Sequence, residues 1–136
     1  MNNAQQKESH IALGDKSFLM LMAIIQNLLD LVDFYMNRFP ADTPSGRIKH
    51  EQLDLAVKTF GTLPYQLASV IGKWKKGEER LLSQIGVELD LLNELQATID
   101  STILFLDREQ IDTSNVGHAE SQEAIATLIR VNRVLN

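Results

Sequence analysis

Hydrophobic residues recur along this chain at alternating steps of three and four, the spacing that places side chains on one face of an α-helix. Asp15 is placed to accept hydrogen bonds from the free amides of a first helical turn. Pro40 ends that helix because it disfavours helical geometry at the preceding residue. We therefore expect residues 1–14 to form a flexible N-terminal tail and residues 15–136 to form a single helical-bundle domain. The first helix, residues 16–39, has the apolar seam Phe18, Leu21, Ile25, Leu28, Val32, Tyr35 and Phe39.

A second seam with the same spacing crosses residues 44–76. It consists of Leu53, Ala56, Phe60, Leu63, Leu67, Val70 and Trp74. The dipeptide Thr43–Pro44 is a typical helix start, with the cap followed by the first helical position. The seam continues without a shift through Gly61–Pro64, so we expect one helix with a Gly/Pro kink there. The alternative is two shorter helices divided at Gly61–Thr62, with Thr62 capping the second.

Two further helices complete the predicted fold. The charged segment Lys75–Glu79 marks a boundary, because lysines suit a helix C-terminus, Gly77 suits a left-handed cap and glutamates suit the next N-terminus. Helices joined by short turns run antiparallel, so the sequence predicts an all-α, antiparallel up-down four-helix bundle. The third helix, residues 78–107, has the seam Leu82, Ile85, Leu89, Leu92, Gln96, Ile99, Ile103 and Leu106. The fourth, residues 119–135, has Ser121, Ile125, Leu128, Asn132 and Leu135 on one stripe.

The first predicted helix carries more apolar surface than a bundle helix with one solvated face requires. Beside its seam runs a second stripe made of Met20, Ile24, Leu31 and Phe34. A helix that is apolar on two sides is either surrounded by its own chain or packed against a second chain. These four residues are the candidate interface for a homodimer or another protein partner, and burial within the core is the alternative.

The same helix contains the strongest candidate for a membrane span, residues 18–36. Asp30 and Asp33 lie inside this window with Gln26 and Asn27, and acidic residues at the membrane centre are strongly disfavoured. Residues 1–10 are polar and lack the apolar region of a secretory signal. We expect a cytoplasmic protein that does not contact a membrane.

Composition excludes several chemistries. The 136 residues include no Cys, which rules out disulfides, thiolate metal sites and a cysteine nucleophile. The 18 Asp and Glu outweigh the 13 Lys and Arg, giving a net charge of −5 that disfavours nucleic acid as a partner. A hydrophobic content of 44% is too high for a disordered chain.

One basic cluster stands out in this acidic chain, namely Lys73, Trp74, Lys75 and Lys76. Because Trp74 continues the second seam, one interpretation is a core aromatic with lysines at the end of a helix. The other is a patch that binds an anion or a protein partner, since exposed tryptophan and cations favour both.

Acidic residues on the first and third helices permit a metal-dependent alternative. Mg²⁺-dependent phosphate chemistry needs several oxygen ligands that converge from facing helices. Of the carboxylates, Glu88 alone falls on an inward stripe, and the paired E-x-x-E and E-x-x-D pattern is missing. His-carboxylate pairs of the di-iron type and a glycine-rich phosphate loop are missing as well. We predict no catalytic, cofactor-binding or metal-binding residues.

The expected function is therefore non-enzymatic protein–protein interaction by a helical bundle that self-associates through its first helix. One alternative is an all-α, metal-dependent nucleotide or phosphate hydrolase that uses carboxylates of the first and third helices. A second is a small-molecule-binding bundle with a pocket opened at the Gly61–Pro64 kink.

Overall fold

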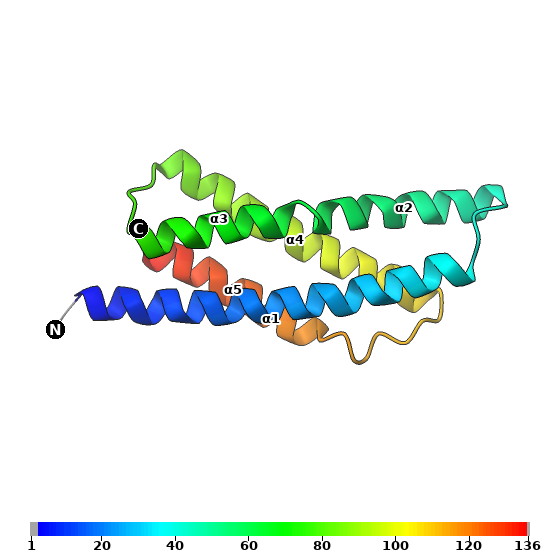
Figure 1. The fold of residues 1–136 in the computed structure, drawn as a ribbon, viewed down its shortest axis with the longest axis horizontal. Coiled ribbons are helices and arrows are strands. Elements are labelled where there is room, and N and C mark those ends of the chain that lie inside the picture. The colour runs from blue at the N-terminus through cyan, green and yellow to red at the C-terminus, as the bar shows by residue number, and fades with distance from the viewer. Residues whose placement is uncertain (1–2, 136) are drawn as a thin grey trace.

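The computed structural model describes residues 3–135, which contain five α-helices and no strand. They are α1 (Asn3–Arg38), α2 (Pro44–Phe60), α3 (Leu63–Lys76), α4 (Leu82–Arg108) and α5 (His118–Val134). α2 and α3 follow one line and together make a single broken rod (Figure 1). The predicted all-α four-helix bundle is confirmed, with 83% of the structure helical.

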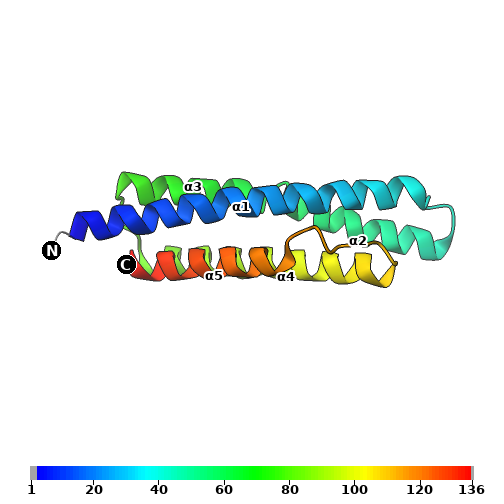
Figure 2. The same cartoon turned by 90° about the horizontal axis from the view of Figure 1, so that it is seen from below.

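The four rods alternate in direction along the bundle. The chain runs out along α1, returns along α2 and α3, runs out again along α4 and returns along α5, so that both ends of the chain lie at one end of the molecule (Figure 1). α5 is shorter than the other rods and lies beside the half of α1 that is nearer the N-terminus (Figure 2). The loop between α4 and α5 runs beside the other half.

The kink predicted in the second rod is confirmed at Gly61–Thr62. The amide of Gly61 still donates to the carbonyl of Val57 at 3.0 Å, so the last turn of α2 is closed. Pro64 lies in the first turn of α3, where its missing N–H removes no helical hydrogen bond. Thr62 occupies the N-cap position of α3, but its hydroxyl donates back to the Lys58 carbonyl at 3.0 Å and makes no capping hydrogen bond.

α1 begins much earlier than the sequence suggested. It starts at Asn3, so Asp15 lies inside the helix and its carboxylate pairs with Lys75 Nζ at 2.9 Å instead of capping a helix. The extra turns pack on the bundle: Ile11 contacts the core, and Gly14 is buried against Trp74. These tertiary contacts extend the helix through a segment whose Ala, Gln, Lys and Glu residues favour helix anyway.

The other helix ends follow local capping rules, with one further correction. Thr43 caps α2 by accepting from the Gly46 amide at 2.9 Å, and Gly77 ends α3 in the left-handed conformation (φ 69°), both as predicted. α4 begins at Leu82 and not at residue 78, because residues 78–81 form a linker without regular secondary structure. The Gln84 side chain accepts from the Leu81 amide at 2.8 Å and fixes this later start.

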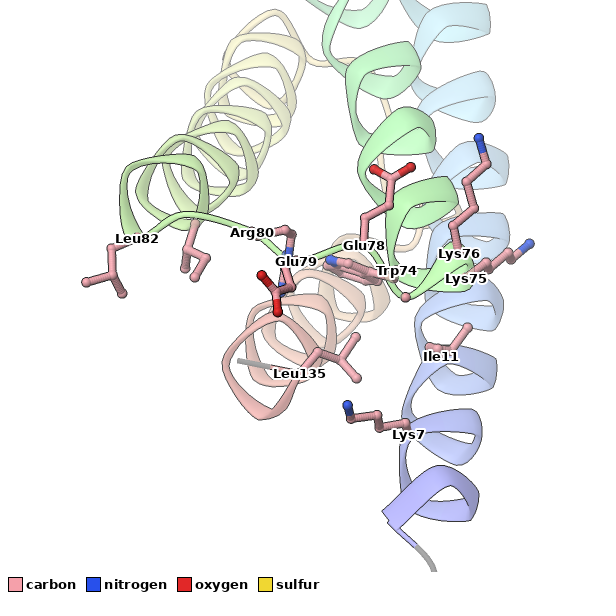
Figure 3. Close-up of a pocket in the computed structure, with 12 residues that line it drawn as sticks. Lys7, Ile11, Trp74, Lys75, Lys76, Glu78, Glu79, Arg80, Leu82 and Leu135 are labelled. Carbon is pink, nitrogen blue, oxygen red and sulfur yellow. The ribbon is translucent and has the colours of Figure 1, made fainter.

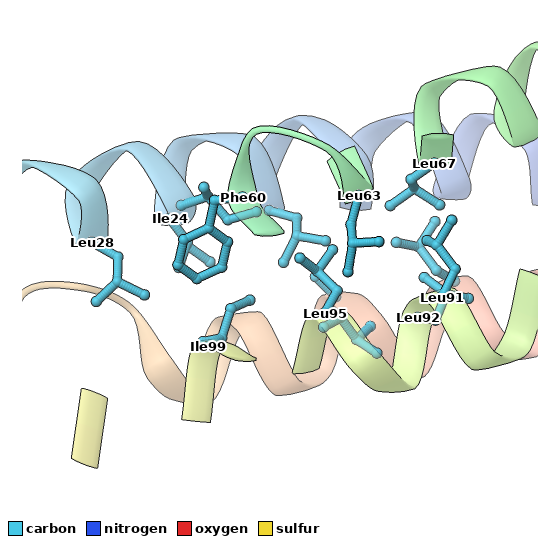
Figure 4. Packing of buried hydrophobic residues seen from close by; sticks show 14 of the residues in the cluster. Ile24, Leu28, Phe60, Leu63, Leu67, Leu91, Leu92, Leu95 and Ile99 are labelled. Atoms are coloured by element: carbon cyan, nitrogen blue, oxygen red, sulfur yellow. The ribbon is translucent and has the colours of Figure 1, made fainter. Parts of the chain in front are cut away.

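One hydrophobic core draws on all five helices, and its residues largely match the predicted seams. At the break between α2 and α3, Phe60 and Leu63 point toward Leu95 and Ile99 of α4 (Figure 4). Burying each such side chain contributes about 1.5–3 kcal/mol to folding. Core side chains thus fill the inner side of the kink.

Candidate functional site

The predicted interface stripe on α1 is divided between core and surface. Ile24 is only 5% exposed, and its Cγ1 atom lies 3.2 Å from the position that a Cβ on Gly117 would take. Leu31 is partly buried, whereas Met20 and Phe34 are 42% and 49% exposed. Ile24 therefore belongs to the core, and Met20 and Phe34 remain on the surface.

Two exposed leucines that the sequence analysis did not select lie on the same side of α1 as Met20 and Phe34. They are Leu13 and Leu19, and Leu19 is 68% exposed. Leu13 is seven residues before Met20, so a heptad count could have found it. We call the surface made of Leu13, Leu19, Met20 and Phe34, with the exposed residues Ala12, Lys16, Ala23, Asn27 and Asp30 among them, the outer face of α1.

By length and composition alone, α1 could also cross a membrane. Its most apolar window of 18 residues, within residues 5–38, has a mean hydropathy of 1.6, and 28% of that window is buried inside the bundle. Core helices of soluble proteins pass the same test. The outer face, however, also contains Lys16 and Asp30, which are disfavoured in a lipid environment.

The basic cluster is divided between the core and the surface. Trp74 is buried in the core, as its place in the seam predicted, while the three lysines are exposed. Lys75 pairs with Asp15 on α1. Lys75 and Lys76 belong to the lining of a cleft beside Trp74 (Figure 3).

That cleft lies at the end of the bundle where α3, the linker 78–81 and the two ends of the chain come together. It has a volume of about 500 Å³ and is lined by Lys7 and Ile11 of α1, by Trp74, and by Leu135 after α5, among others (Figure 3). The indole Nε1–H of Trp74 is buried and finds no acceptor among the described residues. A buried donor without an acceptor costs about 1–3 kcal/mol, which an oxygen of a ligand or a water molecule could recover.

Next to the cleft lies a buried polar network. Arg80 Nη1 donates to Glu88 Oε1, and Asn132 Nδ2 donates to the same oxygen at 2.8 Å. The Arg80 and Glu88 side chains are 5% and 7% exposed. The Arg80 guanidinium also lies 5.7 Å from the centre of the Trp74 ring. The inward position expected for Glu88 is confirmed, and its carboxylate is held by Arg80 and Asn132.

A second polar cluster lies at the opposite end of the bundle. The Tyr35 hydroxyl donates to Glu109 Oε1 at 2.5 Å, and Lys49 Nζ lies 2.7 Å from the same oxygen. Burial of Tyr35, together with this hydrogen bond, raises the pKa of the phenol to about 12. The hydrogen bonds from Lys49 and Tyr35 hold the pKa of Glu109 below its ordinary value. The arrangement fastens α1, α2 and the end of α4 to one another.

Metal-binding chemistry has little support within residues 3–135. They contain no group of three or more histidine and carboxylate side chains that could hold a metal ion. Folding does bring His118 Nε2 to 2.7 Å from Asp100 Oδ1, where Gln96 also donates at 2.7 Å. This pair lies at the surface, and one carboxylate with one imidazole is too few ligands for a stable site.

Comparison with known proteins finds no match: no protein-family model, no curated protein sequence and no solved structure matches the chain. The function is therefore argued from the geometry of the outer face and of the cleft.

Proposed function

We propose that this protein is a helical bundle that acts by protein–protein interaction, and that it associates with a second copy of itself through the outer face of α1. The observation that carries the proposal is the presence of four large exposed apolar side chains on the solvent-exposed side of this helix: Leu13, Leu19, Met20 and Phe34.

Exposed apolar residues also occur on the other helices, and single ones need no explanation. The α1 residues differ because Leu13 and Phe34 are about 30 Å apart along one continuous helix and the other two lie between them. Leu13, Met20 and Phe34 are spaced by seven and fourteen residues, which keeps them on one side, and Leu19 lies beside this line, one residue before Met20. Such a stripe suits a partner helix that packs lengthwise.

The charges on the outer face favour a protein partner in water over lipid. Lys16 and Asp30 lie among the apolar residues, and such charges are disfavoured against lipid but can pair with opposite charges of a protein partner. The proposal accordingly keeps the expected cytoplasmic setting.

The test compares two leucine substitutions. Leu19→Glu places a charge on the outer face, whereas Leu55→Glu places one on α2 at a leucine of nearly equal exposure (68% and 66%). Because both positions are solvated in the monomer, both variants should keep the helical circular dichroism spectrum. Sedimentation equilibrium should show weaker self-association for Leu19→Glu alone. Equal self-association in the two variants would remove the outer face from the interface.

A second candidate function, small-molecule binding, is favoured by the cleft and by the buried indole N–H of Trp74. The cleft has a volume typical of ligand pockets, and it joins the apolar side chains of Ile11 and Leu135 to the ammonium group of Lys7. The lining also contains Lys75, Lys76 and Arg80, which outnumber Glu78 and Glu79. These features suit a small apolar molecule that carries an oxygen acceptor or a negative charge.

Trp74 is the only tryptophan of the chain, so its fluorescence reports directly on the cleft. Titration with anilinonaphthalene sulfonate, an apolar anion, should quench this fluorescence by energy transfer. Lys7→Glu should weaken the binding, and Lys58→Glu, on the distant helix α2, should not. Absence of quenching, or equal effects of the two substitutions, would count against a ligand site at this cleft.

A further inference from the structure

We infer that the two copies pair antiparallel along α1, with the two-fold axis passing beside Ala23 and with Lys16 of each copy opposite Asp30 of the other. This inference rests on the proposed self-association and adds its orientation and register.

The spacing of three residues on the outer face supports this register. Ala23 lies seven residues after Lys16 and seven before Asp30, so each charge is about 10.5 Å from Ala23 along the helix. A seven-residue step turns an α-helix by only about 20° from a full repeat, so the three side chains stay on one side. A two-fold axis beside Ala23 therefore brings Lys16 of one copy to Asp30 of the other, twice in each dimer.

The same axis also matches the apolar residues at the two ends of the outer face. Leu13 lies ten residues before Ala23 and Phe34 eleven residues after it, so Leu13 of each copy comes next to Phe34 of the other. Ala23 meets its own counterpart at the crossing point, where a small side chain allows two helices to approach closely. Apolar contacts at both ends and close contact at the centre then enclose the two charge pairs.

The charges also decide against the parallel arrangement. A parallel pair in register would place Lys16 beside Lys16 and Asp30 beside Asp30, which is repulsive at both positions. Neither residue has an ion-pair partner in the part of the chain that the structure describes. Asp30 accepts from Gln26 through Oδ1 at 2.9 Å, and its second oxygen can accept from a lysine.

Charge reversal tests the pairing. Lys16→Glu places two acidic residues opposite each other at both contacts, and Asp30→Lys does the same with two lysines. Each variant alone should self-associate at least about tenfold more weakly than the unmodified chain. An equimolar mixture of the two variants restores both opposite-charge contacts. Native mass spectrometry, with a mass tag on one variant, should therefore show mainly the mixed dimer.

Cysteine cross-linking tests the register independently, because the chain has no cysteine of its own. Under a mild thiol oxidant such as diamide, Ala23→Cys should form a dimer linked by a disulfide. Ala12→Cys, the matched exposed alanine on the outer face, should not, since antiparallel pairing keeps the two copies of residue 12 about 33 Å apart along the axis.

The outcomes separate this inference from the proposed function. Cross-linking at both alanines, or statistical mixing of the two charge variants, would overturn the antiparallel register, even where Leu19→Glu still shows that the outer face is the interface. Normal dimerisation of both charge variants would do the same. A chain that stays monomeric without any substitution would overturn both the inference and the proposed function.

Discussion

The guanidinium of Arg80 and the carboxylate of Glu88 form an ion pair inside the bundle, and Asn132 donates to the same carboxylate oxygen. The pair joins the linker 78–81 to α4, and Asn132 adds α5. It holds together the end of the bundle that contains the cleft, and it gives the inward carboxylate of α4 a structural partner.

Breaking this pair should destabilise the protein strongly. Glu88→Gln leaves the Arg80 charge buried without a countercharge, and loss of one partner of a buried pair typically costs about 3–5 kcal/mol. Urea unfolding followed by circular dichroism measures the change. Glu94→Gln, at an exposed position of the same helix, is the matched control and should change the free energy of unfolding by less than about 0.5 kcal/mol. Similar midpoints for the two variants would show that the pair contributes little.

Two glycines should respond to alanine with opposite signs. Gly86 is an exposed residue within α4, and a Cβ added there meets nothing within 4 Å. Gly86→Ala should therefore stabilise the protein by up to about 1 kcal/mol through helix propensity. Gly117 has φ 95°, and its added Cβ would lie 3.2 Å from Ile24 Cγ1, so Gly117→Ala should destabilise the protein. Thermal unfolding of the two variants checks both signs, and a shared sign would contradict the local geometry.

The Tyr35–Glu109 contact predicts a loss of stability at alkaline pH. The pKa of Tyr35 is raised from its ordinary value of 10.0 to about 12 in the folded protein. The unfolded chain thus loses the phenol proton first, and the stabilisation is complete below pH 10 and lost as the pH rises toward about 12. An ultraviolet titration of the Tyr65→Phe variant, in which Tyr35 is the only tyrosine, should show the raised value. A phenol that titrates at its ordinary pKa would show that the contact is not formed.

Acid should weaken the same cluster from its other partner. Because the pKa of Glu109 is lowered by Lys49 and Tyr35, its stabilising contribution is present above the ordinary value of 4.5 and is lost as the pH falls through the lowered value. Glu109→Gln should remove this part of the acid dependence of urea unfolding. If the free energy of unfolding of that variant falls at acid pH as much as that of the unmodified chain, other carboxylates cause the acid dependence.

Much of the fold follows from the periodicity of the hydrophobic residues, and the wrong predictions have physical causes. The seams, the cap at Thr43, the left-handed Gly77 and the break after Gly61 are all set by neighbours in sequence. The start of α1 could not be predicted from neighbouring residues. Gly14 looks like a weak point in a helix, yet the structure packs it against Trp74, which is 60 residues away.

The candidate site was harder to predict because it also depends on contacts between residues that are far apart in the sequence. Two apolar stripes on α1 do not reveal which of them turns inward, and Ile24 is covered by the loop residue Gly117. The network of Arg80, Glu88 and Asn132 joins residues that are up to 52 positions apart. Glu88 could be recognised from its stripe, but its partners come from a linker that was expected to be helical and from α5.

Sedimentation equilibrium of the unmodified chain over a range of concentrations tests the central claim most directly. Self-association through the outer face of α1 predicts a species with twice the monomer mass of 15.3 kDa, whose share rises with concentration. A single species of 15.3 kDa at every concentration, up to hundreds of micromolar, would contradict it.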